Sequence, residues 1–147
     1  MEILIGGRTI PLLLTTFELV AIQEEIGCTV AQLRDEVFGA YQDEENGPAG
    51  KPQWHFSVAT DAAKMKKLGT LIRITGNAGL DDAGQDPDLT DKWILRNIKP
   101  AMVLPVAIVM MAVVNDAMMM ETAKKDENSG KIDVTLQEIN RKKEQGK

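Results

Sequence analysis

The sequence predicts an α+β fold dominated by helices, with a short N-terminal β-hairpin followed by about five or six helices. Residues 2–5 and 9–14 are short runs rich in β-formers, and the Gly6-Gly7-Arg8 connection between them is typical of a hairpin turn. Downstream, several stretches repeat apolar residues at helical spacing. We therefore expect strands only within residues 2–14 and helices over most of the remainder.

The amino-acid composition disfavours several kinds of function for this protein. The chain has 147 residues, enough for one hydrophobic core, and its net charge of −5 disfavours binding to nucleic-acid phosphates. Its single cysteine, Cys28, and single histidine, His55, cannot form an internal disulfide or a Cys/His zinc site. The N-terminal residues lack the basic start and long apolar run of a signal peptide, so a cytoplasmic location is expected.

Two capping boxes predict the first helices. Thr15 is followed three residues later by Glu18, and apolar residues then recur at helical spacing, which predicts a helix over residues 16–26. The same box begins again at Thr29 and predicts a second helix over residues 30–41.

A polar segment interrupts the helical pattern at residues 42–53. It contains two prolines, two glycines and several acids, and it predicts a mobile loop. Trp54 and Phe56 follow as an isolated aromatic pair on either side of His55. We expect no catalytic role for this histidine, because the sequence places no partner acid beside it.

Three further helices are expected. Thr60 is a plausible cap for a helix over residues 59–77, and the Gly-Asn-Ala-Gly sequence at residues 76–79 is expected to end it. The acids in residues 80–91 lack the spacing of a calcium-binding EF-hand loop and are read as helix caps and solvated turns. Thr90 is expected to cap a short helix, and Pro100 to stand at the start of the next.

The most informative stretch is residues 101–114, which contain no polar side chain. A membrane span needs about 20 apolar residues, and Asn115 and Asp116 end this run early, so a buried core helix is favoured over a membrane segment. A helix that is apolar on every side must be packed against other apolar surfaces on every side. A chain of this size has few helices that can cover it. We therefore expect a homo-oligomer in which another subunit contributes part of the cover.

The candidate protein-binding residues are Met118, Met119, Met120, Trp54 and Phe56. Three consecutive methionines span about 300° of a helix surface, so at least one should face outward. Methionine also adapts to partners of varied shape. The alternative is that these side chains pack within this protein or between its own subunits.

The chain is expected to divide into a domain of residues 1–122 and a C-terminal part, residues 123–147. The second part is a polar linker followed by a marginal helix with few large apolar residues, and we expect it to be mobile. We find no GxSxG, HExxH, phosphate-binding GxxxxGK[ST] or CxxC motif. The sequence therefore predicts a protein that is not an enzyme, with no cofactor and no metal.

The layout resembles the tail assembly chaperones of long-tailed phages and prophages, especially those of Gram-positive hosts. The likeness rests on the hairpin leading into T-x-F-E-L, the LIRITGNAGLDDAGQDPDLTDKW block, the long apolar helix and the ending DVTLQEINRKKEQG. It implies a non-catalytic protein of the host cytoplasm that binds the tape measure protein, helps to recruit tail tube protein and is absent from the finished virion. It also implies that this chain is the shorter of two forms made by ribosomal frameshifting. The alternatives are a structural virion component, such as a tail tube or head–tail connector subunit, and a small helical regulator.

Overall fold

Residues 1–43 and 53–119 are described by the computed structural model of the chain. The chain divides into two units, Met1–Ala117 and Met118–Lys147, and almost all of the described residues belong to the first. The fold is mainly helical with a short N-terminal hairpin, as predicted. The expected division between residues 122 and 123, and the predicted C-terminal helix, lie outside the described residues.

The N-terminal hairpin consists of β1 (Glu2–Ile5) and β2 (Arg8–Pro11), which pair antiparallel. Gly6 and Gly7 both have positive φ angles, of 57° and 76°, as the tight two-residue turn requires. Alternation along the strands directs one row of isoleucines into the core: Ile3, Ile5 and Ile10.

The first helix, α1 (Thr16–Ile26), has the bounds that the sequence predicts. The side chain of Thr15 accepts a hydrogen bond from the backbone N–H of Phe17, and Glu18 accepts from the backbone N–H of Thr15 at 2.8 Å. Gly27 then ends the helix in the left-handed conformation. Local capping signals are therefore sufficient to set both ends of α1.

The helix predicted over residues 30–41 begins at the predicted Thr29 capping box, but it ends at Phe38 and is not a regular α-helix. A 3₁₀ turn, η1 (Val30–Gln32), leads into a π-helical segment, η2 (Arg34–Phe38), and the chain then forms β3 (Ala40–Asp43). Gly39 makes this change of direction with a φ of 56°, and a Cβ at that position would lie 1.8 Å from the Ser57 hydroxyl oxygen. The helix therefore ends at a glycine that is closely packed against the chain 18 residues later.

A second hairpin forms around the expected loop, in residues for which no strand was predicted. β3 pairs antiparallel with β4 (Gln53–Phe56), so that Ala40 lies opposite Phe56. The expectation that strands are confined to residues 2–14 is therefore wrong, because tertiary pairing across the loop sets this element. The part of the predicted mobile loop between the strands, residues 44–52, lies outside the described residues.

The longest helix, α2 (Ala62–Asp82), is preceded by a 3₁₀ turn, η4 (Ser57–Thr60), and capped by Asp61 rather than by Thr60. It continues through the predicted stop at residues 76–79. Gly76 and Gly79 are both buried, and they lie where the hairpin residues Ile10 and Pro11 approach the helix most closely. These glycines allow close packing and do not end the helix.

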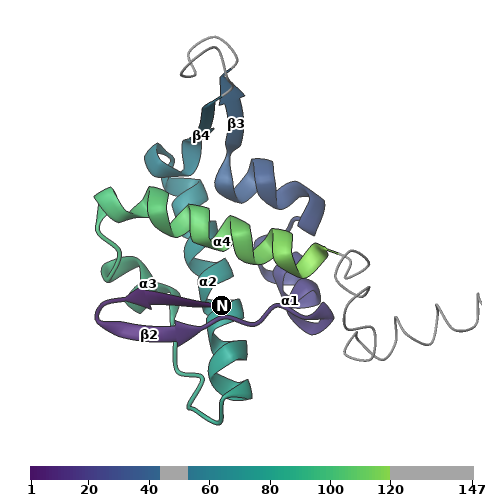
Figure 1. Ribbon diagram of the computed structural model, residues 1–147, viewed down its shortest axis with the longest axis vertical. Helices are drawn as coiled ribbons and strands as arrows, with labels where there is room; N and C mark the ends of the chain where they lie inside the picture. The colour runs from purple at the N-terminus through teal and green to yellow at the C-terminus, as the bar shows by residue number, and fades with distance from the viewer. Residues whose placement is uncertain (44–52, 120–147) are drawn as a thin grey trace, which may run out of the picture. The chain divides into compact units, whose positions relative to one another are not determined.

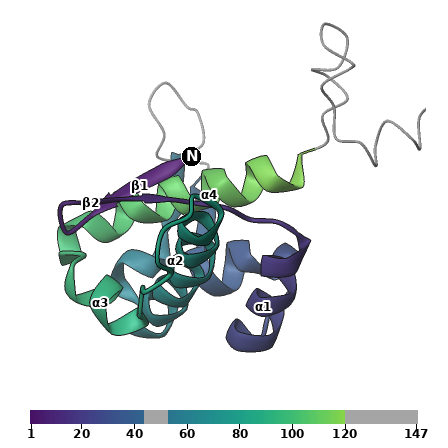
Figure 2. The ribbon, with the colours of Figure 1, turned by 90° about the horizontal axis from the view of Figure 1, so that it is seen from below.

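Three elements follow α2: α3 (Asp91–Arg96), the 3₁₀ turn η5 (Pro100–Met102) and α4 (Val103–Met118). Thr90 caps α3, accepting from the backbone N–H of Trp93 at 3.1 Å, as predicted. α2 is central: it contacts α1, α3, η2, η4 and β2. α4 crosses over α2 in Figure 1 and runs next to it in Figure 2.

Candidate protein-binding surface

α4 has two apolar faces, and only one of them is covered. The inward face is buried and consists of Val103, Val106, Ala107, Met110, Val113 and Val114. On the opposite face Leu104 is 41% exposed and Ile108 is 50% exposed. The expectation of a helix buried within the core therefore holds for one side alone, and the remaining apolar surface is open in the single chain.

The second hairpin borders this open face. Trp54, Phe56, Ile108, Met111, Ala112 and Asn115 line a shallow hollow of about 300 Å³ between β4 and α4. Trp54 and Phe56 are two residues apart on a strand and so project to the same side of the hairpin. We call Leu104, Ile108, Met111 and Ala112, together with these two aromatic residues, the α4 face.

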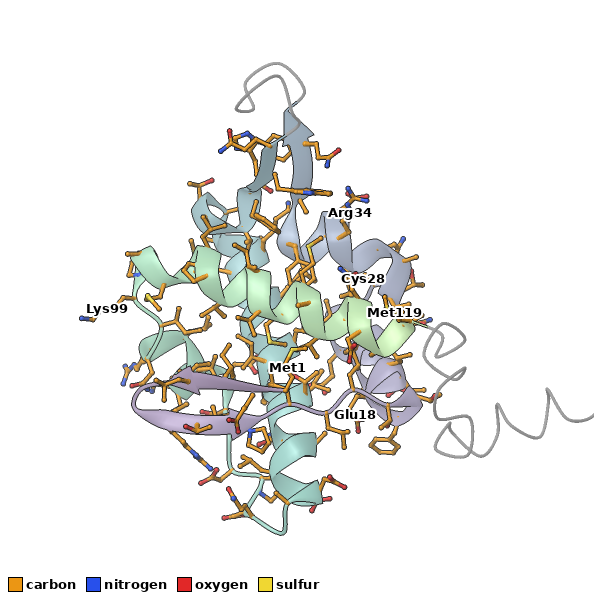
Figure 3. The ribbon with its side chains drawn as sticks, in the orientation of Figure 1. Met1, Glu18, Cys28, Arg34, Lys99 and Met119 are labelled. Atoms are coloured by element: carbon orange, nitrogen blue, oxygen red, sulfur yellow. The ribbon has the colours of Figure 1, made fainter. Side chains whose placement is uncertain are left out.

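The two aromatic rings are held in place by different contacts. Their centroids lie 6.5 Å apart, and the Arg34 guanidinium lies over the Trp54 ring, 4.6 Å from its centroid. Figure 3 shows Arg34 in η2, beside the base of the hairpin. Phe56 packs partly against the core, while Trp54 remains 40% exposed. On the other side of the hairpin, Tyr41 and His55 stack with their centroids 5.1 Å apart.

Of the predicted methionine cluster, Met118 and Met119 are described and Met120 is not. Met118 is the last residue of α4 and is 50% exposed, and Met119 is 64% exposed. The prediction that at least one of the three faces outward is therefore confirmed. Both belong to the second unit. Met110 and Met111, earlier in the helix, pack into or against the core.

The α4 face is suited to holding an apolar partner. Contiguous exposed apolar side chains on a folded protein commonly mark an interaction surface. Across residues 1–43 and 53–119 no group of three or more His, Cys, Asp or Glu side chains is placed to hold a metal ion. The arrangement offers adaptable apolar contact, with an aromatic pair at one edge.

The segment Pro100–Met118 is also long and apolar enough to cross a membrane, judged by length and composition alone. That criterion is met equally by core helices of soluble proteins. A third of the window is buried against the rest of the chain.

Partly exposed ion pairs connect three of the helices. Arg73 of α2 forms ion pairs with Glu25 of α1 and, at 2.6 Å, with Asp91 of α3. Burial lowers the pKa of this guanidinium, but the hydrogen bonds that it donates to both carboxylates outweigh burial and raise the pKa overall. This arginine therefore remains charged and fixes the positions of three helices.

Sequence reasoning identified Trp54 and Phe56 but missed Leu104, Ile108 and Arg34. The residues 101–114 are apolar throughout, so their pattern contains no contrast that distinguishes an inner from an outer face. Arg34 is placed over Trp54 only by the hairpin, which the sequence did not predict. Comparison of the chain with protein-family models, curated protein sequences and solved structures gives no match.

Proposed function

We propose that this chain is a tail assembly chaperone of a long-tailed phage or prophage that acts in the host cytoplasm. In this proposal it binds the tape measure protein, a long apolar helical chain, until tail tube subunits enclose it. The observation that carries the proposal is the α4 face, an apolar helix surface left open beside an aromatic hairpin.

The chemistry of the α4 face matches such a client. An amphipathic helix docks by laying its apolar side along an apolar groove, with anchor side chains spaced at one and two helical turns. Ile108 and Met111 of α4 are about one helical turn apart and border the hollow next to Trp54. Met111 adapts to varied side chains, which suits a client whose apolar face changes along its length.

The net charge of the chain also supports a chaperone role. The net charge of −5 opposes indiscriminate association of chaperone–client complexes in the cytoplasm. The α4 face itself contains no charged side chain. Binding there is therefore expected to depend mainly on apolar burial, and to change little with salt concentration.

The test is capture of a tape measure fragment by the double variant Leu104→Glu/Ile108→Glu. Burying either side chain contributes about 1.5–3 kcal/mol, so placing two carboxylates there should weaken capture by more than about tenfold. Val20→Glu is the matched control, because Val20 is 53% exposed on α1 and is not part of this face. Co-purification and light scattering would give client capture and oligomer size for each variant.

The competing occupant of this face is a second copy of the chain. Lost capture with an unchanged oligomer, and normal capture by Val20→Glu, would support the client site. Unchanged capture by the double variant would refute it. Loss of the oligomer by the double variant would assign the face to contact between subunits.

A further inference from the structure

A second groove lies on a different part of the first unit, between α2 and the α3–η5 segment. It has a volume of about 700 Å³, and its apolar lining consists chiefly of Met65, Leu68, Gly69, Leu95, Ile98 and Val103. We call it the α2–α3 groove. It shares no lining residue with the α4 face.

Three cations stand on the rim of the α2–α3 groove. Lys66, Arg96 and Lys99 line it, all three are exposed, and Lys99 points outward from the fold in Figure 3. Among the residues that the structure describes, the ion pairs involve Arg8, Lys64, Lys67 and Arg73, and none involves a rim cation. The rim charges are therefore available to a ligand.

The one acid in the lining is already engaged. The two carboxylate oxygens of Asp91 accept separate hydrogen bonds, from the Thr70 hydroxyl at 2.7 Å and from Arg73 at 2.6 Å. Asp91 therefore does little to neutralise the rim. On a chain with a net charge of −5, this groove is a local site of positive charge over an apolar floor.

The shape of the groove favours a helix over a small molecule. Ala62, Met65, Lys66 and Gly69 form one stripe of α2 that covers eight residues and is about 10 Å long. Two turns of a docking helix present apolar anchors over the same length. Leu95 on the opposite wall is 38% exposed, so the groove is open along its side. Small-molecule sites instead enclose about 70–90% of their ligand.

We propose that the α2–α3 groove binds an amphipathic helix with acidic flanks, supplied by a partner protein. The apolar floor receives two or three aliphatic anchors, and the rim cations pair with carboxylates on either side of them. The charge complementarity selects against basic helices. The inference goes beyond the proposed function, because it concerns another surface and a different chemistry of recognition.

The probe is a fluorescein-labelled 15-residue peptide with Leu at positions spaced for one helix face and Glu and Ala elsewhere. A peptide with Lys in place of Glu is its control. Fluorescence anisotropy with the full chain should show binding of the Glu peptide at least about tenfold tighter than that of the Lys peptide. Affinity should fall as salt rises from 0.05 to 0.5 M, since the rim pairs are exposed to solvent.

The variant Lys66→Glu/Arg96→Glu/Lys99→Glu should reverse this preference. Lys92→Glu is the matched control. Lys92 is exposed and lies on α3, the helix that contains Arg96, but it is not part of the groove lining. Circular dichroism would establish that each variant is folded, and Leu95→Ser provides a milder change that should weaken both peptides. Equal binding of the two peptides, or an unchanged preference in the triple variant, would overturn the proposal. Displacement of the Glu peptide by micromolar dodecanoate would also overturn it, if Leu95→Ser weakened the binding of dodecanoate as it weakens that of the peptides. That result would assign the groove to a small anionic amphiphile.

Discussion

Gly79 of α2 lies so close to Pro11 of β2 that a Cβ added to the glycine would be 2.0 Å from the proline carbonyl oxygen. Next to this contact, the backbone N–H of Leu13 donates to the carbonyl of Thr75 at 3.0 Å. The N-terminal hairpin therefore meets α2 backbone against backbone. A side chain at residue 79 would force the hairpin and the helix apart.

Gly79→Ala is expected to destabilise the protein. In an exposed helix interior the same change would stabilise by about 0.5–1 kcal/mol, because alanine has the better helix propensity. Here overpacking against backbone atoms costs about 1–3 kcal/mol and reverses the sign. Urea denaturation monitored by circular dichroism would measure the free energy of unfolding.

Gly69→Ala is the control for that measurement. Its added Cβ would approach only the side chain of Leu95, at 2.9 Å, and this exposed leucine can rotate away. We expect Gly69→Ala to leave stability unchanged or to raise it slightly. A Gly79→Ala variant as stable as Gly69→Ala would show that the hairpin tolerates the side chain.

The same glycines explain where sequence reasoning succeeded and where it did not. The first hairpin and α1 were predicted because their turn and capping signals lie within a few residues of each other. The stop at residues 76–79 was predicted wrongly, because a glycine that ends a helix and a glycine that admits a neighbouring strand look alike in one sequence. Contact with Pro11, more than 60 residues away, distinguishes the two cases.

The candidate surface shows the same limit. An isolated aromatic pair after a polar segment was enough to select Trp54 and Phe56. Their neighbour Ile108 could not be selected, since it lies more than 50 residues away in a run that is uniformly apolar. Which face of that run is open depends on how α4 is placed over α2, and no local pattern contains that information.

Asp61 is expected to make the start of α2 sensitive to acid. The pKa of its carboxyl is lowered, first by the hydrogen bond from the backbone N–H of Lys64 and then by the bond from the Lys64 ammonium group. A lowered folded-state pKa means that the ionised cap stabilises the fold above the ordinary aspartate pKa, near 3.9. This contribution is lost as the pH falls through the lowered value.

Comparison of the native chain with Asp61→Asn would measure the effect, because asparagine keeps the capping oxygen but not the charge. The native chain should be the more stable of the two at pH 6, and the difference should vanish towards pH 2. A difference in melting temperature that is constant over this range would contradict the assignment. Carbon NMR of the Asp61 carboxyl would report its pKa directly.

Cys28 is expected to resist alkylation in the folded protein. It is 5% exposed, and burial raises the pKa of its thiol; the Lys67 ammonium opposes this shift and the Glu36 carboxylate adds to it. Because the thiolate is the reactive form, modification by iodoacetamide at pH 8 should be much slower in the native state than in guanidinium. Lys67→Met should slow it further and Glu36→Gln should speed it. Equal rates for the native and unfolded protein would show that Cys28 is open to solvent.

Trp54 is expected to report directly on occupation of the α4 face. Its ring is 40% exposed and lines the hollow next to Ile108, so a helix bound there would remove water from the indole. The other tryptophan, Trp93, lies on α3 with the Arg8 guanidinium 5.9 Å from its ring centroid and does not line the hollow. The two rings therefore provide a probe and an internal control within one chain.

The variants Trp93→Phe and Trp54→Phe leave one indole each. On addition of a tape measure fragment, the emission of Trp93→Phe should shift to shorter wavelength, while that of Trp54→Phe should not. Introducing Ile108→Glu into Trp93→Phe should abolish the shift, because the carboxylate would have to be buried against the client. A shift in both single-indole variants would indicate a general change of conformation on binding. A shift in Trp54→Phe alone would place the client near Trp93 and away from the α4 face.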